Sequence, residues 1–259
     1  KRPDVDTRTP DVRISAFLTD VDATFYLDTS GEPLFKRGFR AEAGSAPLKE
    51  NLAAGIVLLS GFKSGETFFD PMCGSGTFLI QAAQMTLDIA PGLGRRFGFA
   101  NLLNFDEKAF NQIHQELEAR CKPITALPIY GSDLYGEALD DAKANLQAAG
   151  LSDAVQLKQA NVLEISPPTE SGVMVMNPPY GVRLGEQRDL EEIYPKLGDV
   201  LKQKFAGWNA YILTADMRLP KLIHLAASKR TPLFNGKLEC RLFEYKMIAG
   251  SRRKPEAVA

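Results

Sequence analysis

The distribution of apolar positions divides most of the chain into short strands that alternate with helices. Apolar runs of strand length are separated by longer stretches with helical periodicity. The expected strands of this part are 67–70, 124–130, 155–157, 173–176 and 210–214, followed by two alternating runs at 236–240 and 242–248 near an Asn-Gly turn. The expected helices are 48–59, 77–89, 106–120, 137–149, 190–205 and 219–227. This alternation predicts an α/β fold with a doubly wound, mostly parallel sheet, which binds its ligand outside the carboxyl ends of the strands.

The first forty residues or so follow a different pattern. Two alternating runs, 12–18 and 23–28, indicate strands. Two strands are too few to bury a core of their own. A connector rich in glycine and proline, 38–47, follows them. We therefore expect two parts, a small β remnant in residues 1–40 and the main domain in residues 41–259.

Composition narrows the class of protein. The chain has 259 residues, 44% of them hydrophobic, which is enough for one large α/β domain and a small appendage. A net charge of -1 argues against a protein that binds nucleic acid over its whole surface. The sequence contains no membrane-length apolar run and no signal peptide, so we expect a cytoplasmic protein. Three scattered cysteines and two histidines have no zinc-site spacing, and we expect no metal. The chain also lacks an initiator methionine, which indicates a fragment of a longer protein.

The segment Asp70-Pro71-Met72-Cys73-Gly74-Ser75-Gly76-Thr77 joins an expected strand to an expected helix. Its glycines let backbone approach a ligand without a Cβ clash, and the helix start offers free N–H groups. A phosphate loop would need lysine where Thr77 stands, and a dinucleotide fingerprint would need glycine where Leu79 stands. S-adenosylmethionine is the remaining candidate, with Asp70 suited to its ammonium group. A plain strand-to-helix turn is the alternative for the glycines alone.

Two further polar residues follow expected strands. A carboxylate at Asp133 can accept both ribose hydroxyls of an adenosine, and Asn161 can accept from an adenine amino group. Each by itself also fits a solvated turn. The distance from the glycine loop to Asp133 is long, so we expect residues 91–123 to be an insertion.

The sharpest motif is Asn177-Pro178-Pro179-Tyr180 after an apolar strand. An exocyclic amine on a base is a poor nucleophile, because its lone pair is delocalised into the ring. The Asn177 side-chain carbonyl and the Pro178 backbone carbonyl can each accept one amino hydrogen, and two prolines fix these acceptors. Tyr180 offers a face on which a flipped base can stack. A loop with a surface tyrosine is the alternative interpretation.

Several basic groups can contact RNA phosphates, although solvated clusters explain each of them alone. They are Arg95-Arg96, Arg218 with Lys221, 228–230 and 251–254. Phe97 and Phe99 beside the first group can supply stacking faces or belong to a core.

With these motifs together, the chain resembles the THUMP-associated class I methyltransferases, in particular the bacterial branch that methylates guanine N2 of 23S ribosomal RNA. The resemblance covers roughly residues 12–248. It rests on the stretches TSGEPLFKRGFR, APLKENLAAGIVLLSGF, FDPMCGSGTFLIQAA, IYGSDLYGEALDDAKANLQAAGL and VMNPPYGVRLGE. It implies a Rossmann-like, seven-stranded, mostly parallel sheet with an antiparallel edge strand, and it implies that residues 1–40 are the end of a THUMP-type RNA-binding region.

The resemblance also implies residue roles and partners. The implied cofactor is S-adenosyl-L-methionine, the implied partner is 23S ribosomal RNA or its precursor, and neither a membrane nor a metal takes part. The implied catalytic residues are Asn177, Pro178, Pro179 and Tyr180. The implied cofactor-binding residues are Asp70, Pro71, Cys73, Gly74, Ser75, Gly76, Thr77, Asp133, Leu134, Asn161, Val162 and Asn177. The chain departs from the family at Asn161, where aspartate is usual, and this bears on the adenine contact.

Other functions share parts of this pattern. DNA adenine or cytosine amino-methyltransferases and protein-glutamine methyltransferases use the same Asn-Pro-Pro chemistry, and only the flanking stretches separate them here. A non-catalytic RNA-binding module that retains the fold is a candidate from another class, and intact motifs argue against it. A nicotinamide oxidoreductase is disfavoured by Leu79.

Overall fold

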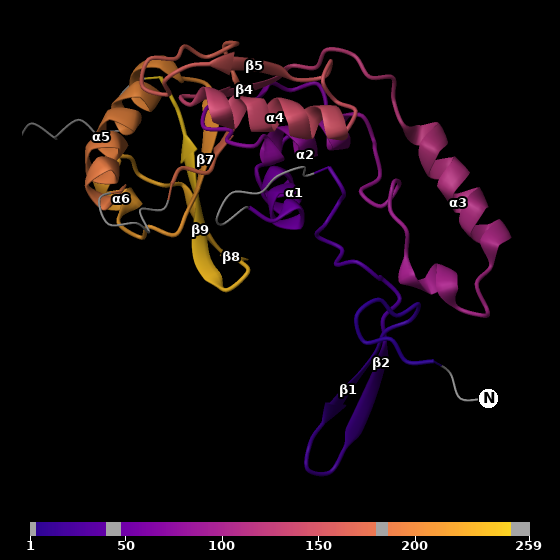
Figure 1. Ribbon diagram of the computed structural model, residues 1–259. Helices are drawn as coiled ribbons and strands as arrows, with labels where there is room; N and C mark the ends of the chain where they lie inside the picture. The colour runs from indigo at the N-terminus through magenta and orange to yellow at the C-terminus, as the bar shows by residue number, and fades with distance from the viewer. Residues whose placement is uncertain (1–3, 40–47, 180–185, 250–259) are drawn as a thin grey trace, which may run out of the picture. The chain divides into compact units, whose positions relative to one another are not determined.

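The computed structural model describes residues 4–39, 48–179 and 186–249, in which the chain forms two compact units (Figure 1). The smaller unit combines residues 1–38 with residues 88–122, and the larger combines residues 39–87 with residues 123–259. No helix within the described ranges is long and apolar enough to span a bilayer.

The larger unit is built on a seven-stranded sheet with the order β5-β4-β3-β6-β7-β9-β8. Its strands are β3 (Phe68–Asp70), β4 (Ile129–Asp133), β5 (Gln156–Gln159), β6 (Gly172–Met176), β7 (Trp208–Thr214), β8 (Lys229–Asn235) and β9 (Leu238–Lys246). The first five strands in this order pair in parallel, and β9 runs antiparallel to both of its neighbours. The expected seven-stranded, mostly parallel fold is thus confirmed.

Helices cover both faces of this sheet. They are α1 (Glu50–Leu59), α2 (Thr77–Thr86), α4 (Gly136–Ala148), α5 (Glu186–Lys204) and α6 (Leu219–Leu222). On one face, a Cβ at Gly131 of β4 would lie 2.3 Å from Leu79 of α2, so only glycine allows this close packing. On the other face, α5 contributes Tyr194, Leu197 and Leu201 to a buried cluster with Phe69 of β3 and residues of β6, β7 and β9. Burial on both faces explains why β3 and β6 are continuous apolar runs.

Three expected boundaries were wrong. The strand expected at 124–130 lies at 129–133, because Pro123 and Pro128 bring no N–H to a ladder. Residues 131–133 belong to the strand and pair with β5, and Gly131 also pairs with β3. The helix expected at 219–227 ends at Leu222, and His224 has a positive φ of 54°. The two runs expected at 236–240 and 242–248 are one strand, β9, whose hairpin partner precedes the turn.

The smaller unit consists of the hairpin β1 (Ile14–Leu18) and β2 (Ala23–Leu27), the 3₁₀ turn η1 (Gly98–Asn101) and the helix α3 (Glu107–Arg120). In the smaller unit, the segment 88–122 is held together by half-buried aromatic rings. Phe97 and Phe99 stack at 5.0 Å, and both pack edge-on against Phe110. These two half-buried rings therefore pack within an aromatic cluster, which favours the packing role over the stacking role that the sequence left open for them.

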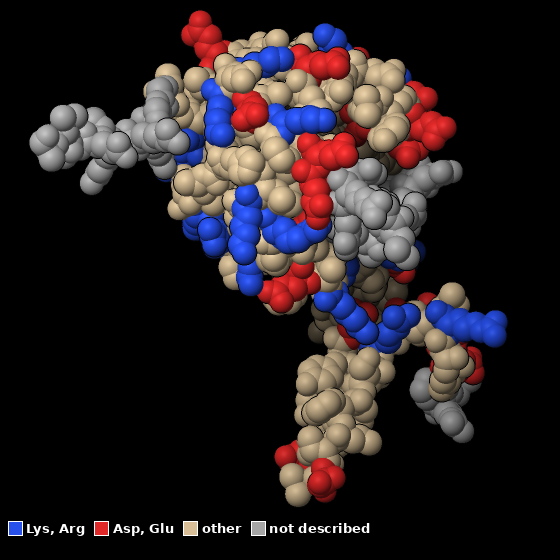
Figure 2. Space-filling view, turned by 90° about the vertical axis from the view of Figure 1, so that its left-hand side faces the viewer, with Lys and Arg blue, Asp and Glu red and all other residues tan. Residues whose placement is uncertain are grey.

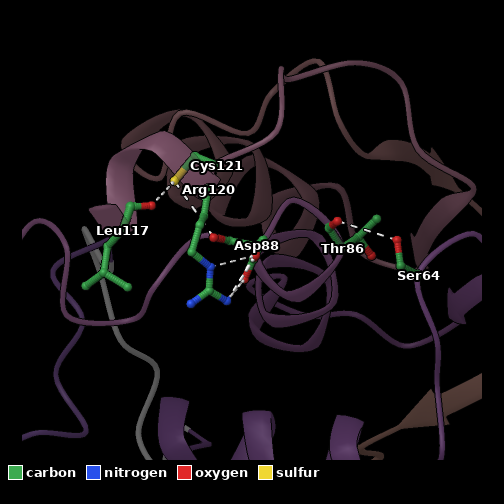
Figure 3. Close-up of polar contacts among 6 residues, drawn as sticks. All are labelled: Ser64, Thr86, Asp88, Leu117, Arg120 and Cys121. Carbon is green, nitrogen blue, oxygen red and sulfur yellow. Dashed lines mark hydrogen bonds and ion pairs between the residues drawn. The ribbon is translucent and has the colours of Figure 1, made fainter. Parts of the chain in front are cut away.

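The ends of the segment 88–122 are joined to each other. Arg120 makes a bidentate ion pair with Asp88 at 3.0 and 3.1 Å, and the Cys121 thiol donates to the Asp88 carbonyl at 3.8 Å (Figure 3). Asp88 has a φ of 55°, a left-handed conformation that ends the preceding helical run. Figure 3 also shows, within the larger unit, the Ser64 hydroxyl donating to the Thr86 carbonyl at 3.5 Å.

Candidate functional site

The carboxyl ends of four parallel strands bring the expected site residues to one edge of the sheet. Asp70 ends β3, Asp133 ends β4, Asn161 follows β5 and Asn177 follows β6. Since the strand order is β5-β4-β3-β6, the glycine loop lies between Asp133 on one side and Asn177 on the other. Neighbouring strands are about 4.8 Å apart. The fold therefore brings together motifs that are separated by more than a hundred residues in the sequence.

Glycines shape the loop after β3. Gly74 and Gly76 have φ values of 49° and 78°, in the left-handed region that other residues avoid. A Cβ at Gly76 would lie 3.3 Å from the Cβ of Ala142, so this glycine lets α2 begin against α4. Among the described residues, nothing lies within 4 Å of a Cβ built at Gly74. The loop thus offers open space at Gly74 and close packing at Gly76.

Hydrogen bonds join the loop to the neighbouring strand. The Gly74 N–H donates to the carboxylate of Asp133 at 2.9 Å, and the Cys73 N–H donates to the Ser132 carbonyl at 2.9 Å. The side chain of Asn145 on α4 donates to the Ser75 carbonyl at 3.0 Å. Asn145 was missed in the sequence, although a polar residue on the inward face of a helix is a signal that can be read.

Asp70 is a buried carboxyl, only 1% exposed, and accepts a hydrogen bond from the Met72 N–H at 3.1 Å. Burial raises its pKa well above the usual range, and the negative charge of Asp133 adds to this effect. Two carboxyl groups at one loop favour a cationic ligand, because a positive charge offsets the desolvation and repulsion that they carry. The sulfonium and ammonium groups of S-adenosylmethionine fit this donor set.

Asp133 and Asn161 are positioned by their own loops. Asp133 accepts from the Tyr135 N–H at 3.1 Å, which fixes the carboxylate at the start of α4. The Asn161 side-chain oxygen accepts from the Leu163 N–H at 3.0 Å, an Asx turn in which a second lone pair of that oxygen can still accept. Leu134 is 50% exposed, whereas Val162 packs partly buried against the core.

The Asn-Pro-Pro segment directly continues a buried strand. Asn177 is half-buried, Pro178 is buried and Pro179 is exposed. In the pairing of β3 with β6, Phe69 lies opposite Met174, so Asn177 lies two residues beyond the level of Asp70. Tyr180 lies outside the described residues.

Cys73 and Thr77 complete the loop as buried residues. Burial raises the pKa of the Cys73 thiol, with further contributions from the charges of Asp70 and Asp133. A thiol held in its neutral form is a poor nucleophile, so Cys73 acts as a small buried loop residue.

A charged cluster at the end of β7 was not found from the sequence. Asp216 accepts two hydrogen bonds from the Arg218 guanidinium, both at 2.9 Å, and Arg218 also donates to Glu191 of α5 at 2.6 Å. Burial acts to raise the pKa of Asp216, but the hydrogen bonds and charge of Arg218 hold it below the usual range. Arg218 is thus engaged by two carboxylates, and a role for it as a free phosphate contact is disfavoured.

Comparison with known proteins decides the family. The model of a family described as RMKL-like, methyltransferase domain matches residues 37–244. The chain belongs to this family. The match includes the glycine loop and the Asn-Pro-Pro segment and most of the larger unit.

Individual relatives show where the similarity extends. The chain is 40% identical over 258 residues to the ribosomal RNA large subunit methyltransferase K/L of Shewanella frigidimarina, which covers 98% of this chain. Among solved structures, it resembles SMU.472, a methyltransferase complexed with S-adenosylhomocysteine, with 35% identity and a TM-score of 0.84 over 94% of this chain and 63% of that one. A Listeria monocytogenes protein described as a predicted N6-adenine-specific DNA methylase matches at 33% identity with a TM-score of 0.82, over 91% of this chain and 61% of that one.

The relatives are longer than this chain. The alignment takes in only 36% of the Shewanella frigidimarina protein. The chain thus spans little more than a third of the length of the curated relatives that it matches.

Proposed function

We propose that this chain is the catalytic domain of an S-adenosylmethionine-dependent methyltransferase that acts on the exocyclic N2 amine of a guanine in 23S ribosomal RNA. The observation that carries the proposal is the shared edge of the sheet, on which the glycine loop has Asp133 on one side and Asn177 on the other. Family membership and the names of the curated relatives support ribosomal RNA methylation. The choice of guanine N2 rests on the resemblance of the flanking stretches to that branch of the family.

The cofactor would be held by the loop after β3 and by the ends of β4 and β5. We assign the methionine part to Asp70, Pro71 and the Cys73–Thr77 loop, where open space at Gly74 and the buried carboxyl fit a cationic amino acid moiety. We assign the ribose to Asp133 with Leu134, and the adenine to Asn161 with Val162. When bound, S-adenosylmethionine supplies a methyl group on a sulfonium that is already activated for transfer.

The protein's part in the reaction is to orient the amine. The Asn177 side-chain carbonyl and the Pro178 backbone carbonyl would accept the two amino hydrogens, which directs the nitrogen lone pair away from the ring plane. The nitrogen gains positive charge as its new bond to carbon forms, so both acceptors bind it more strongly in the transition state than in the ground state. The excess proton then leaves to water. We assign the stacking of the base to Tyr180.

This function can be tested by methyl transfer in vitro. The chain is incubated with methyl-labelled S-adenosylmethionine and with 23S ribosomal RNA, duplex DNA or a glutamine-containing release-factor peptide. We expect label in the RNA, as N2-methylguanosine after digestion to nucleosides and mass spectrometry. Label in adenine or cytosine of DNA, or in the peptide, would support one of the other amino-methyltransferases instead.

Asn177→Ala is the variant that ties the activity to the proposed acceptors. We expect kcat to fall by about 10²- to 10³-fold, the usual cost of removing one transition-state contact, while cofactor affinity in calorimetry changes little. Asn209→Ala is the matched control, because Asn209 is exposed and lies near the opposite edge of the sheet. Unchanged turnover in Asn177→Ala would refute its assigned role.

A further inference from the structure

The β8–β9 hairpin extends past the sheet at the edge that holds the candidate site. Both β7 and β8 run antiparallel to β9, so the end of β8 points the same way as the end of β7. Thr214, the last residue of β7, pairs with Arg241, whereas the hairpin continues to the pair Asn235–Leu238. At about 3.3 Å per residue, the hairpin continues roughly 10 Å beyond the end of β7.

The tip of this hairpin is anchored to the start of α1. The side chain of Asn235 accepts from the Lys49 N–H at 3.3 Å. Gly236 makes the turn with a φ of 68°, and a Cβ at this glycine would lie 3.7 Å from the Lys49 ammonium nitrogen. Because Lys49 caps α1, the tip is held in place and brings a further cation close to it.

The hairpin is basic although the chain is not. Residues 229–246 contain five Lys or Arg and two Glu, whereas the whole chain has a net charge of -1. Glu239 pairs with Arg241 at 2.9 Å and Glu244 pairs with Lys246 at 3.6 Å. Within the described part of the chain, the remaining cations of the hairpin make no ion pair. They are Lys229, Arg230 and Lys237.

Figure 2 shows one face of the molecule, on which Lys and Arg side chains lie among Asp and Glu side chains on the surface of the larger unit. The nearby Arg218 differs, because two carboxylates already engage it. Positive potential at this edge therefore comes from the hairpin more than from the loop after β7.

An aromatic ring lies among these cations. Phe234 is 62% exposed and pairs across the hairpin with Glu239. Arg241 pairs with Pro232 two residues away, which places Arg241 diagonal to Phe234 on one face. An exposed ring next to basic side chains is the arrangement with which proteins bind single-stranded nucleic acid.

We propose that the β8–β9 hairpin binds the RNA strand beside the target nucleotide, through Phe234, Lys237 and Lys49 at its tip and through Arg230 further back along β8. Phe234 stacks on an unpaired base, and the lysines and Arg230 contact phosphates. This rests on the proposed function, and the charge of the hairpin selects an RNA strand as the occupant. Three strand spacings separate β6 from β8, about 14 Å, so the tip contacts nucleotides near the one that Asn177 holds.

The test uses two hairpin variants with matched controls. Lys237→Glu and Phe234→Ala are compared with Lys143→Glu on α4 and Leu58→Ala on α1, both exposed and distant from the hairpin in the sequence. Binding of a fluorescent single-stranded, guanine-containing RNA is followed by anisotropy at several salt concentrations. Methyl transfer and cofactor affinity are measured in parallel.

We expect both hairpin variants to weaken RNA binding, by about 5- to 150-fold for Phe234→Ala, which is the range for loss of one stacked base. Lys237→Glu should also lower the slope of log affinity against log salt by about 1. The Michaelis constant for RNA should rise in both, whereas cofactor affinity and both controls stay at the wild-type level.

RNA affinities and salt slopes equal to wild type, or equal losses in the controls, would overturn the proposal. The binding assay does not depend on catalysis. If the wild-type chain binds RNA through the hairpin but methylates none, the proposed function fails and the hairpin proposal stands.

Discussion

At the scale of single residues, the site is governed by the cost of burying charge. Asp70 lies almost completely inside the protein beside a second carboxylate, an arrangement that destabilises the ligand-free fold. A residue with this cost is expected where it serves binding, because functional sites and maximal stability often conflict.

Asp70→Asn should therefore stabilise the ligand-free chain and weaken cofactor binding. Asparagine can still accept from the Met72 N–H but carries no charge to desolvate. The raised pKa means that the folded chain holds the Asp70 proton more tightly than the unfolded chain does. The wild type thus loses stability as pH rises above about 4, the unfolded value, until the folded carboxyl has ionised.

The measurement is thermal unfolding without cofactor between pH 4 and 8, together with calorimetry of cofactor binding. We expect the unfolding midpoint of the variant to equal that of the wild type at pH 4. As pH rises, the midpoint of the variant should exceed that of the wild type by a growing amount. We expect its cofactor affinity to fall by about tenfold, the value of one charge-assisted contact. A variant that is less stable at pH 8 would contradict this account.

At the scale of elements, helices α5 and α6 pack closely at a glycine of α5. A Cβ at Gly198 in the middle of α5 would lie 1.9 Å from the Ile223 carbonyl oxygen, just after α6. Gly55 in the middle of α1 has open space around the same position among the described residues. Both glycines lie inside helices, where alanine has the higher intrinsic helix propensity, so the two positions differ only in how closely their neighbours pack.

Gly198→Ala should lower the free energy of unfolding by about 1–3 kcal/mol through overpacking, even though alanine is the better helix former. Gly55→Ala should raise it by about 0.5–1 kcal/mol. Urea unfolding of the ligand-free chain measures both changes. Equal effects in the two variants would show that α5 and α6 do not approach each other as described.

The hairpin of β8 and β9 shows why elements at the sheet edge were hard to predict. The sequence of β8 contains Pro232 and begins with basic residues, so the sequence alone indicated a solvated basic cluster and no strand. An edge strand tolerates proline, because its outer N–H groups need no partner, and it tolerates charge, because one side faces water. Its antiparallel pairing with β9, which includes the pair of Pro232 with Arg241, identifies it as a strand.

At the scale of the whole molecule, the chain forms its smaller unit from two distant segments. Arg95 of the segment 88–122 donates to the carbonyls of Pro33, Lys36 and Ser30 at 3.3 to 3.5 Å, and to that of Glu32. The Phe99 N–H donates to the Thr29 carbonyl at 2.9 Å. The sequence placed Arg95 among possible RNA contacts, but its guanidinium is occupied by backbone. The origin of the hairpin β1–β2 as the end of a THUMP-type region remains our proposal.

Arg95→Ala should loosen residues 29–36 from the segment 88–122. Each hydrogen bond from a charged donor contributes about 1.5–3 kcal/mol, so local amide exchange should accelerate by about 10- to 100-fold. Hydrogen exchange with mass spectrometry measures this, with β3 and β6 as internal references. Arg96→Ala is the control, since Arg96 is exposed and donates to the Asn101 side chain at 3.2 Å. Equal exchange in both variants would show that Arg95 does not hold the unit together.

Local patterns in the sequence determined the alternation of strands and helices, the positions of the glycine loop and the Asn-Pro-Pro segment, and the class of sheet. They did so because hydrophobic periodicity and turn chemistry act over a few residues. The tertiary structure decided what depends on distant neighbours: the burial of Asp70 beside Asp133, the engagement of Arg95 and Arg218 by other groups, and the extension of the β8–β9 hairpin past β7. Burial, ion pairing and strand register arise from contacts between segments far apart in the chain, and no local pattern encodes them.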